Sequence, residues 1–589
     1  MNNSRYKIVL ALFLIILPIL VFKIWNNIYT NQYAISAKIP ALRGSIYDTK
    51  GRLLATSEIV YAAYLDVGYL KSIAGTAFKR DPDFIKMLSN FGLVEKFGDI
   101  EKKNMVKLGS FSKRDEIQKK IPTQYLRFVS IEPEERRVSV QNFGLNFIIG
   151  RTEERVGTSG AEMYFDKILR PIRDGVTSVK YSGFIGSKIG TTRIDPENGK
   201  DVRLSIDSAL QKKLYEFAKN YLGEKQASEV GILIMESETG KIRVALTTQS
   251  WPTYYMGYFE PGSTIKPILF AAALELGLVT TDTHFYCPGY IKPIDGLSLT
   301  IKDLEKHGDI DLYHGLVHSC NVVSILTTKK IVDTFGKEKL YEILSSFGFG
   351  KETGIELPGE IPGKLNPPDK WYLADWAFIG IGQSIGVTPL QLLAAFNSIV
   401  NNGVYVSPTL DDSKQVLSKR IISQATSQIV KNMLLDVVNI GTAINAKLDG
   451  VNIYGKTGTA QKNRKKDVTA LFVGQVELDQ KYSILVWVDS PQIEKLSSVV
   501  AAPFFKNVVQ ELMSYISESR SQKILNDTQN LNLRGWTIKQ VYSLAQKNNL
   551  PVKIYNKGLY VDKYDFELTP EGTTLALWLS NIPPSLKVY

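Results

Sequence analysis

The sequence contains very few of the residues that bind metals or link chain segments covalently. Among 589 residues it has two cysteines, Cys287 and Cys320, and four histidines. The two cysteines form no C-x-x-C pair and no set of several disulfides, which excludes the small disulfide-rich scaffolds. No long internal repeat is present. The chain is therefore expected to fold around hydrophobic cores rather than around covalent links.

Neither sign of charge dominates the sequence. The formal net charge is +12, from 71 basic and 59 acidic residues. The basic residues are scattered, so nucleic acid is not the expected partner, and a protein that faces anionic lipid or an anionic polymer fits as well. The hydrophobic fraction of 44% is that of a globular protein. A chain of 589 residues is too long for one core, so two to four domains are expected.

Only one run of the sequence is long and apolar enough to span a membrane. A helix from Ile8 to Trp25 would be about 27 Å long at roughly 1.5 Å per residue, close to the ~30 Å of a hydrocarbon core. Arg5 and Lys7 precede it and favour a cytoplasmic N-terminus, with the rest of the chain outside. A cleaved signal peptide is the alternative, but "AISA" (34–37) is a poor cleavage site and lies far from the run. We therefore predict an uncleaved anchor.

The composition changes along the chain in a way that predicts several domains. A tract that mixes short strands and helices with charged loops precedes a longer segment with long helices, and a polar stretch follows that segment. The predicted parts are a cytoplasmic tip and membrane anchor (1–26), an extended non-catalytic domain (27–201), a catalytic domain (202–518), a linker (519–530) and a small α+β domain (531–581).

The predicted catalytic domain begins and ends with strands. The segment 229–247 contains two apolar runs around Thr239-Gly240, which is typical of a hairpin. Long helical stretches follow, and further strands occupy 451–460 and 469–490. Strands on both sides of a helical block predict one α/β core whose sheet is built from both ends of the segment.

The stretch "YFEPGSTIKPILFAAALE" places a serine and a lysine at the start of a buried helix. Pro261-Gly262 predicts a turn, and Pro267 is tolerated only in a first helical turn, so the helix begins at or just before Ser263. Positions three apart share a face, so Lys266 can reach the Ser263 hydroxyl. Burial lowers a lysine pKa, as a base that works near neutral pH requires. Other S-x-x-K copies lack this context.

Two further motifs occur once each in the chain. Ser319-Cys320-Asn321 is the one S-x-N sequence, and Lys456-Thr457-Gly458 is the one K-T-G sequence, continued by Thr459. S-x-x-K, S-D-N and K-T-G in this order are the signature of class A β-lactamases and penicillin-binding proteins. Here Cys320 replaces the middle aspartate.

With "RGSIYDTKGRLLA" and "EPGSTIKP", the chain resembles the class B, monofunctional penicillin-binding proteins. "GTSGAEMYFDKIL" is similar to the G-x-x-G-x-E segment of their pedestal domain, and "GIGQSIGVTPLQ" and "GKTGTAQ" resemble their transpeptidase domain. Ser139 and Val140 depart from the family's usual Tyr-Pro. The C-terminal part, including a T-x-x-Q capping box at Thr537, resembles a PASTA domain, which favours the division or sporulation branch, as in FtsI-type enzymes.

This resemblance implies a β-lactamase-like transpeptidase domain, an antiparallel sheet with helices on both sides, and a peptidoglycan substrate that ends in D-Ala-D-Ala. By resemblance, Lys266 takes the proton of Ser263, which attacks the penultimate carbonyl. Ser319 relays the proton to the leaving amine. Lys456 tunes the site, and Asn321 holds the peptide amide and orients the lysine.

The resemblance also implies where the donor peptide and β-lactam antibiotics bind. The strand of Lys456 should be a sheet edge to which the peptide adds, with Gly458 allowing close approach. Thr457 and Thr459 would bind the terminal carboxylate, and the backbone N–H groups of Ser263 and Thr459 would form the oxyanion hole. β-Lactams would acylate Ser263.

The resemblance implies no metal or cofactor. The expected partner is an FtsW/SEDS-type glycosyltransferase, and the expected location of catalysis is the outer side of the cytoplasmic membrane.

Several alternatives stay open or are disfavoured. The open ones are a D,D-carboxypeptidase or β-lactamase of the same fold, and a non-catalytic sensor or division scaffold.

His314 and His318 have metal-ligand spacing, but no third ligand is apparent. Ser384 lies in a G-x-S-x-G sequence, yet every histidine precedes it, which disfavours a hydrolase triad. Cys320 is interpreted as a small buried filler rather than a reactive thiol.

Overall fold

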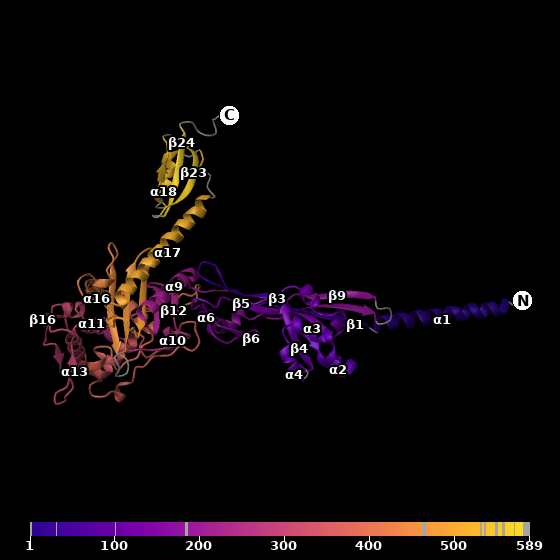
Figure 1. Cartoon of the computed structure of the whole chain (residues 1–589), viewed down its shortest axis with the longest axis horizontal. Helices are drawn as coiled ribbons and strands as arrows, with labels where there is room; N and C mark the ends of the chain where they lie inside the picture. Colours follow the sequence, from indigo (N-terminus) through magenta and orange to yellow (C-terminus); the bar gives the residue numbers. More distant parts are fainter. Residues whose placement is uncertain are drawn as a thin grey trace. The chain divides into compact units, whose positions relative to one another are not determined.

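The chain divides into two compact units, and Figure 1 labels their helices and strands. Unit 1 comprises residues 1–204 with 356–358, and unit 2 comprises the rest. The boundary between the two units after residue 204 lies close to the predicted domain boundary at 201/202. The computed structural model describes residues 3–30, 32–100, 102–182, 187–461, 467–529, 533–534, 537–547, 552–556, 560–569 and 572–580.

The predicted anchor is a helix. α1 spans Asn3–Thr30, and its segment Tyr6–Asn26 is long and apolar enough to cross a membrane. Its side chains are not buried by the rest of the chain, as expected for a helix whose apolar surface faces lipid. Pro18 lies within this helix, which a membrane helix tolerates. Among the described residues it is the one helix that meets these criteria.

Besides α1, the described part of unit 1 contains two larger sheets, a two-stranded pair formed by β6 (Thr152–Glu153) and β7 (Val156–Gly157), and several short helices. One sheet has the order β1–β8–β9 and the other β10–β2–β3–β4, with β5 also paired to β3. Phe84 and Met87, from α3, lie in a hydrophobic core beside the long strand β3. The elements are β1 (Gln32–Ile39), β2 (Ile46–Tyr47), β3 (Leu53–Asp66), α2 (Val67–Ala74), α3 (Pro82–Asn90), β4 (Met105–Phe111), β5 (Val129–Ser139), β8 (Gly175–Ser182), β9 (Lys188–Ile194) and β10 (Val202–Arg203).

A buried ion-pair network explains the motifs that unit 1 shares with the family it resembles. Arg43 Nε lies 2.6 Å from Glu162 Oε2, and Arg137 Nε lies 2.7 Å from Glu162 Oε1. Arg43 also pairs with Asp166 at 2.6 Å. A Cβ at Gly157 would lie 1.9 Å from the Glu162 carbonyl oxygen, so only glycine fits there. Ser139, one of the two residues that depart from the family's usual Tyr-Pro, pairs with Ala55 of β3.

The core of unit 2 is a five-stranded antiparallel sheet of order β12–β11–β21–β20–β19. The first two strands form the predicted hairpin, and the other three come from the far end of the segment. β19 is therefore an edge strand, as predicted for the strand that carries Lys456. The bounds are β11 (Glu229–Glu236), β12 (Ile242–Thr247), β19 (Ile453–Gln461), β20 (Val468–Glu477) and β21 (Lys481–Asp489).

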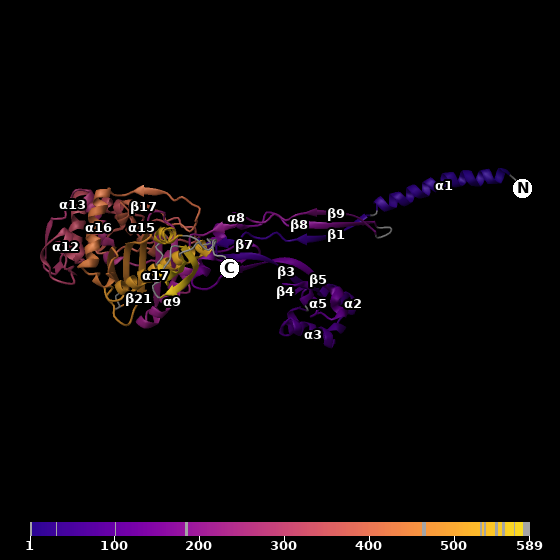
Figure 2. The same cartoon turned by 90° about the horizontal axis from the view of Figure 1, so that it is seen from above.

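Helices cover both faces of this sheet, as the resemblance predicts (Figures 1 and 2). α9 (Ser208–Lys225) and α17 (Ala501–Gln529) contribute to a core that includes Ile484 of β21. The preceding residue, Ser483, donates a 2.7 Å hydrogen bond to Asn397 of α15 (Pro389–Val400). Successive strand residues point to opposite faces, so α15 lies on the face away from α9 and α17.

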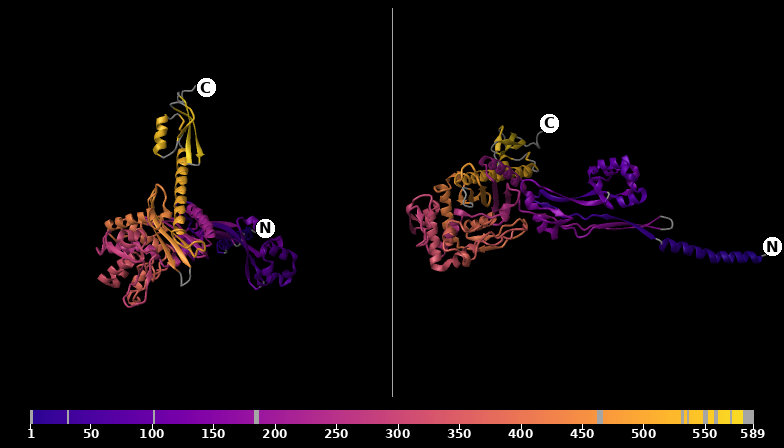
Figure 3. Two further views of the ribbon diagram at one scale, coloured as in Figure 1. Left: turned by 60° about the vertical axis from the view of Figure 1, so that its left-hand side comes forward. Right: turned by 60° about the horizontal axis from the view of Figure 1, so that its bottom comes forward.

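The predicted linker (519–530) is not an irregular connection. α17, drawn in orange and yellow in Figure 3, continues through Gln529. The reason is compositional: after Pro503 the sequence has neither proline nor glycine until Gly535. The description resumes at residue 533, so residue 530 lies outside it.

The C-terminal part has the predicted α+β content. α18 (Ile538–Lys547) precedes a sheet of order β22–β24–β23, formed by Val552–Ile554, Gly572–Ser580 and Tyr560–Thr569. The predicted capping box is present: Thr537 N–H donates to Gln540 Oε1 at 2.8 Å, and Gln540 N–H donates to Thr537 Oγ1 at 3.4 Å. Assignment of this part to the PASTA family stays a prediction.

Candidate active site

Ser263 and Lys266 lie at the start of a buried helix, as the sequence predicts. A 3₁₀ turn (Gly262–Ile265) leads into α11 (Lys266–Glu275). Gly262 has φ +54°, and a Cβ there would lie 2.9 Å from the Thr459 carbonyl oxygen. Glycine is therefore required both for this turn and for its close approach to β19.

The Lys266 amine is fully buried and has no carboxylate partner among the described residues. It donates hydrogen bonds to Asn321 Oδ1 at 2.7 Å, Ser319 O at 2.5 Å and Ser319 Oγ at 3.3 Å. Burial lowers its pKa to about 8, although the charges of Asp303 and Cys320 oppose the shift. No hydrogen bond joins it to Ser263 Oγ within the described chain, so the predicted direct contact is replaced by contacts with the second motif.

Ser319 links the two buried lysines. It lies between α12 (Leu312–Val317) and α13 (Asn321–Ser346), with a left-handed φ of +57°. Its hydroxyl accepts a 2.7 Å hydrogen bond from Lys456 Nζ. Burial, and then the neighbouring Lys266 charge, hold the pKa of Lys456 well below its ordinary value. Because both lysine amines contact the Ser319 hydroxyl, a proton can pass between them through Ser319. No carboxylate partner holds that proton on either lysine among the described residues.

β19 carries the third motif along the sheet edge. A Cβ on Gly458 would lie 2.7 Å from Thr264 Cγ2 and 2.9 Å from the Pro261 carbonyl oxygen. The crowding that requires glycine thus comes from the Ser263 turn. Thr459 is exposed, whereas Thr457 is buried. The two hydroxyls that we expect to bind a carboxylate therefore differ in accessibility.

Two polar residues that the sequence motifs do not include support the site. The Ser497 hydroxyl contacts the Gly458 carbonyl oxygen and lies 2.7 Å from Thr459 Oγ1. Asp303 Oδ2 accepts the Asn321 backbone N–H at 3.1 Å. Neither residue has a sequence signature, because each lies on a separate loop that only the fold brings to the site.

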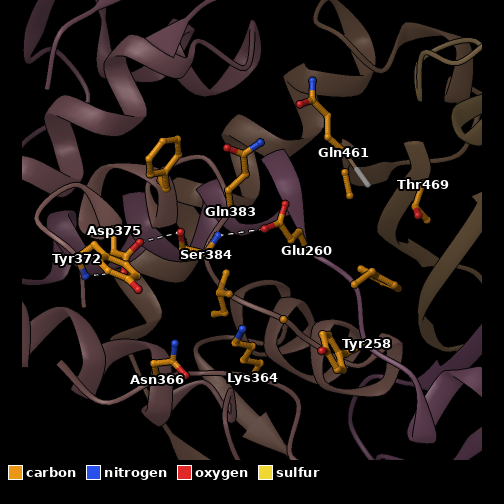
Figure 4. Close-up of a pocket in the computed structure, with 15 residues that line it drawn as sticks. Tyr258, Glu260, Lys364, Asn366, Tyr372, Asp375, Gln383, Ser384, Gln461 and Thr469 are labelled. Carbon is orange, nitrogen blue, oxygen red and sulfur yellow. Dashed lines mark hydrogen bonds between the residues drawn. The ribbon is translucent and has the colours of Figure 1, made fainter. Parts of the chain in front are cut away.

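A cavity of about 900 Å³ lies beside the Ser263 turn. Figure 4 shows Glu260 and Ser384 facing one another in it: Ser384 N–H donates to Glu260 Oε1 at 3.2 Å. The Ser384 hydroxyl donates to Asp375 Oδ1 at 2.9 Å and has no histidine partner within the described residues. Burial raises the pKa of Glu260. Other lining residues include Tyr258, Lys364, Gln383, Ala460, Gln461 and Thr469.

His314 and His318 do not form a metal site within the described chain. Their rings stack with centroids 6.3 Å apart, and His314 Nδ1 lies 2.8 Å from Asp311 Oδ1. They belong to no group of potential ligand atoms close enough to share an ion. The i, i+4 spacing thus places the two rings on the same side of the helix, but no set of ligand atoms around them is close enough to share an ion among the described residues.

The fold and the site define a domain in which a serine at a helix start lies against a sheet edge, and two buried lysines meet at the hydroxyl of a second serine, Ser319. Residues 230–510 match the family described as "Penicillin binding protein transpeptidase domain". Over these residues the chain is similar to the penicillin-binding proteins.

Named relatives resemble the chain over a longer part of its length. "Stage V sporulation protein D" of Bacillus subtilis is 28% identical over 455 residues, which cover 69% of each chain. "Probable peptidoglycan D,D-transpeptidase PenA" of Neisseria gonorrhoeae is 25% identical over 518 residues, 81% of this chain and 85% of that protein.

Two solved structures share the fold. Penicillin-binding protein 3 of Mycobacterium tuberculosis, complexed with aztreonam, has a TM-score of 0.60 at 22% identity, over 82% of this chain and 97% of that one. PBP2 of Helicobacter pylori, in complex with MreC, has a TM-score of 0.65 at 20% identity, over 82% and 99%.

Proposed function

We propose that this protein is a peptidoglycan D,D-transpeptidase that works through an acyl-enzyme on Ser263. The observation that carries the proposal is the buried Lys266–Ser319–Lys456 network beside Ser263, inside a penicillin-binding transpeptidase domain. A hydroxyl is a weak nucleophile, and a neutral amine next to it supplies the missing base. Two desolvated lysines without a carboxylate partner favour such a neutral amine.

In the acylation step Ser263 Oγ forms a bond to the carbonyl carbon of the penultimate D-alanine, and its proton passes to Lys266. The oxyanion is stabilised by the backbone N–H groups of Ser263 and Thr459. The C–N bond then breaks, and terminal D-alanine leaves with a proton relayed through Ser319. An amine of a second stem peptide attacks the ester, restores the Ser263 hydroxyl and completes the cross-link.

Asn321 and Lys456 act by positioning and by charge. Asn321 accepts a hydrogen bond from Lys266 through Oδ1 and donates from Nδ2 to the Lys302 carbonyl at 3.0 Å, which fixes its amide orientation. It would hold the donor's peptide amide and keep the Lys266 amine near Ser263. Lys456 is fully buried and its pKa is lowered, but a nearby negative charge favours the ammonium form, so the arriving donor carboxylate would favour protonation of Lys456 and be attracted by the resulting charge.

The donor peptide adds to the free side of β19 as an extra strand, because an edge strand has unpaired N–H and C=O groups. Its terminal carboxylate reaches the exposed hydroxyl of Thr459 first. Thr457, being buried, contributes after a side-chain rearrangement or through Thr442, whose hydroxyl lies 3.5 Å away. The cavity around Glu260 accommodates a further part of the wall peptide.

The cellular placement follows from α1 and from the relatives. Basic residues before the apolar run favour catalysis on the outer, periplasmic side of the cytoplasmic membrane. One relative is named a sporulation protein, and one structural neighbour was solved in complex with MreC. We propose a septal or sporulation role with a SEDS-type (FtsW-like) glycosyltransferase as partner, since the sequence contains no glycosyltransferase signature.

Covalent labelling tests the proposal. The full-length protein in detergent, incubated with a fluorescent penicillin, should acquire one label, and peptide mapping should locate it on Ser263. Ser263→Ala should abolish labelling with an unchanged circular dichroism spectrum. Labelling of Ser263→Ala would refute the nucleophile assignment.

The fate of the ester distinguishes a transpeptidase from hydrolases of the same fold. We expect the penicilloyl ester to persist for minutes to hours, since a transpeptidase excludes water from its ester. Rapid multiple turnover of penicillin would indicate a β-lactamase. Release of a donor peptide by water alone, even with an amine acceptor and a polymerase partner present, would indicate a carboxypeptidase.

A further inference from the structure

A second cavity lies in unit 2 beside the one that contains Glu260. Its volume is about 300 Å³, and the two cavities share lining residues, among them Tyr258 and Thr469, which Figure 4 labels. Other lining residues come from the ends of β11 and β21 and from the segment before and within α10 (Thr253–Met256). The second cavity therefore adjoins the space next to the nucleophile.

One wall of this cavity is a row of polar residues that crosses the sheet. Thr469 pairs with Ala460 of the edge strand β19 and with Asp489 of β21. Asp489 in turn pairs with Glu229 of β11. Directly paired residues point to the same face of a sheet, so these side chains form one line. At about 4.8 Å per strand, the row extends about 14 Å from β19 to β11.

Glu229, at the far end of the row, has one carboxylate oxygen available to a ligand. Its Oε1 accepts hydrogen bonds from the Thr247 hydroxyl at 2.7 Å and from Trp487 Nε1 at 2.8 Å, and also contacts the Thr253 hydroxyl. Its Oε2 accepts none from the described residues, although only 8% of Glu229 is exposed. None of the described lining residues is basic. The cavity therefore disfavours an anion and favours a ligand rich in hydroxyl or N–H donors.

Large apolar side chains line the same cavity and are exposed to solvent. Trp251, Met256 and Tyr258 are 45%, 39% and 57% exposed. Exposed apolar groups that gather at a pocket are typical of a ligand-binding groove. Aromatic rings offer a flat apolar face, so the ligand should have a flat apolar face of its own in addition to its hydrogen-bond donors.

We propose that this cavity binds a neutral sugar ring of the glycan strand to which the donor stem peptide is attached. A pyranose ring has an apolar C–H face, which can stack on Trp251, and hydroxyl groups, which can donate to Glu229. An ammonium ligand would also suit the carboxylates. The aromatic side chains and the position of the cavity beside the catalytic cleft favour the sugar.

The position of the cavity fits the path of the donor, and this step rests on the proposed function. The scissile carbonyl lies at the Thr459 N–H and the carboxylate lies towards Thr457. The preceding residues of the stem therefore run past Ala460 and Gln461, at the end of β19. Four extended residues reach about 13 Å at roughly 3.3 Å each, which is comparable with the length of the polar row. A sugar at the far end of the stem can thus reach the cavity.

Binding of a soluble glycan tests the site without catalysis. The full-length protein, in a detergent that has no sugar headgroup, should bind a β-1,4-linked N-acetylglucosamine tetramer saturably in isothermal titration calorimetry. Free lysine, as an ammonium probe, should not displace the tetramer. Absence of saturable binding would overturn the proposal. Displacement by lysine would mean that the carboxylates bind a cation, and the sugar assignment would be wrong.

Variants of Trp251 and a matched control locate the bound sugar. Trp251→Ala should weaken tetramer binding roughly tenfold through loss of the aromatic face. Trp251→Phe keeps an aromatic ring and should retain most of the affinity. Tyr286→Ala removes an exposed ring of β13 (His284–Cys287) that lines neither cavity, and it should bind like the wild-type protein. Wild-type affinity in Trp251→Ala would overturn the assignment.

A cross-linking assay connects the site with the proposed function. Glu229→Gln keeps the shape of the side chain and replaces one accepting oxygen by an NH₂ group. It should raise KM for a glycan-linked donor more than KM for a sugar-free stem peptide. An equal change for both donors would mean that Glu229 is structural, and the proposal would be overturned. Absence of penicillin labelling in the wild-type protein would count against the proposed function, whereas normal labelling without glycan binding would count against this site alone.

Discussion

At the scale of single residues, the site depends on amines that burial keeps partly unprotonated. Lys266 and Lys456 are both fully buried and donate only to oxygens of neutral groups among the described residues. A desolvated ammonium group without a carboxylate in hydrogen-bond contact is unfavourable, so its pKa falls, and for Lys266 the charge of Asp303 opposes this shift only in part. The same burial that costs folding free energy therefore supplies the base.

Lys266→Arg keeps the charge and removes the base, since arginine stays protonated. We expect acylation by a fluorescent penicillin to slow by about 10²–10⁴-fold, the usual contribution of general-base catalysis. Stopped-flow or gel-based labelling kinetics would measure the change, and circular dichroism would control for folding. A near-normal rate would transfer the base role to Lys456 acting through Ser319.

The pH dependence of acylation follows from the lowered pKa of Lys266, about 8. The neutral amine is the active form, so the rate should rise as pH increases towards 8 and level off above it. An ordinary lysine would instead give a rate that still increases near pH 10. A pH profile of labelling between 6 and 10 checks this. A rate that is independent of pH across that range would contradict the assignment.

At the scale of elements, the site is a contact between the Ser263 turn and the edge strand β19. Two glycines make that contact possible: Gly262 meets the Thr459 carbonyl, and Gly458 meets Thr264 and Pro261. The distance between the nucleophile and the proposed oxyanion donor on Thr459 therefore depends on the absence of side chains at both positions.

Gly458→Ala should push the strand away from the turn. Its Cβ would lie 2.7 Å from Thr264 Cγ2 and 2.9 Å from backbone, so we expect a loss of about 1–3 kcal/mol of unfolding free energy and slower acylation. Gly223→Ala on α9, where a Cβ would meet nothing within 4 Å, is the control and should be neutral or slightly stabilising. Thermal melts and labelling rates distinguish the two. Equal behaviour of both variants would contradict the crowding argument.

At the scale of the whole molecule, the two units carry separate duties. The Arg43–Glu162–Arg137 network lies within unit 1, whereas Ser263 and its partners lie within unit 2. Breaking a buried ion pair by removing one partner leaves an uncompensated charge and typically costs about 3–5 kcal/mol.

Glu162→Ala should therefore destabilise unit 1 while penicillin labelling of Ser263 persists. Limited proteolysis should cleave unit 1 of this variant faster than that of the wild-type protein, and labelling of the same sample should remain near normal. Arg193→Ala removes an exposed ion pair in the same unit and should change neither property. Loss of labelling in parallel with unit 1 would show that the two units are energetically coupled.

The sequence by itself determined the apolar N-terminal helix, the three motifs, the strands at both ends of the catalytic segment, and the helix start at Ser263, whereas the edge position of β19 was expected only from the resemblance. Each of these depends on local chemistry: a long apolar run, a Pro-Gly turn, or alternation around a tight turn. Contiguous motifs are readable because their residues are neighbours in the chain. The continuation of α17 through residues 519–529 was not predicted, although the absence of proline and glycine from this stretch permits it.

Only the tertiary structure decided which groups Lys266 contacts, how Ser497 and Asp303 support the site, and that Glu229, Trp251, Thr469 and Asp489 line one cavity. His314 and His318 are recognisable in the sequence because their spacing is regular, whereas Cys320 has no such partner nearby and is interpreted there as a filler. The four residues that line the cavity have no fixed spacing, because they lie on three strand ends and in a loop. Their proximity comes from how unit 2 packs, and packing has no signature in the order of residues.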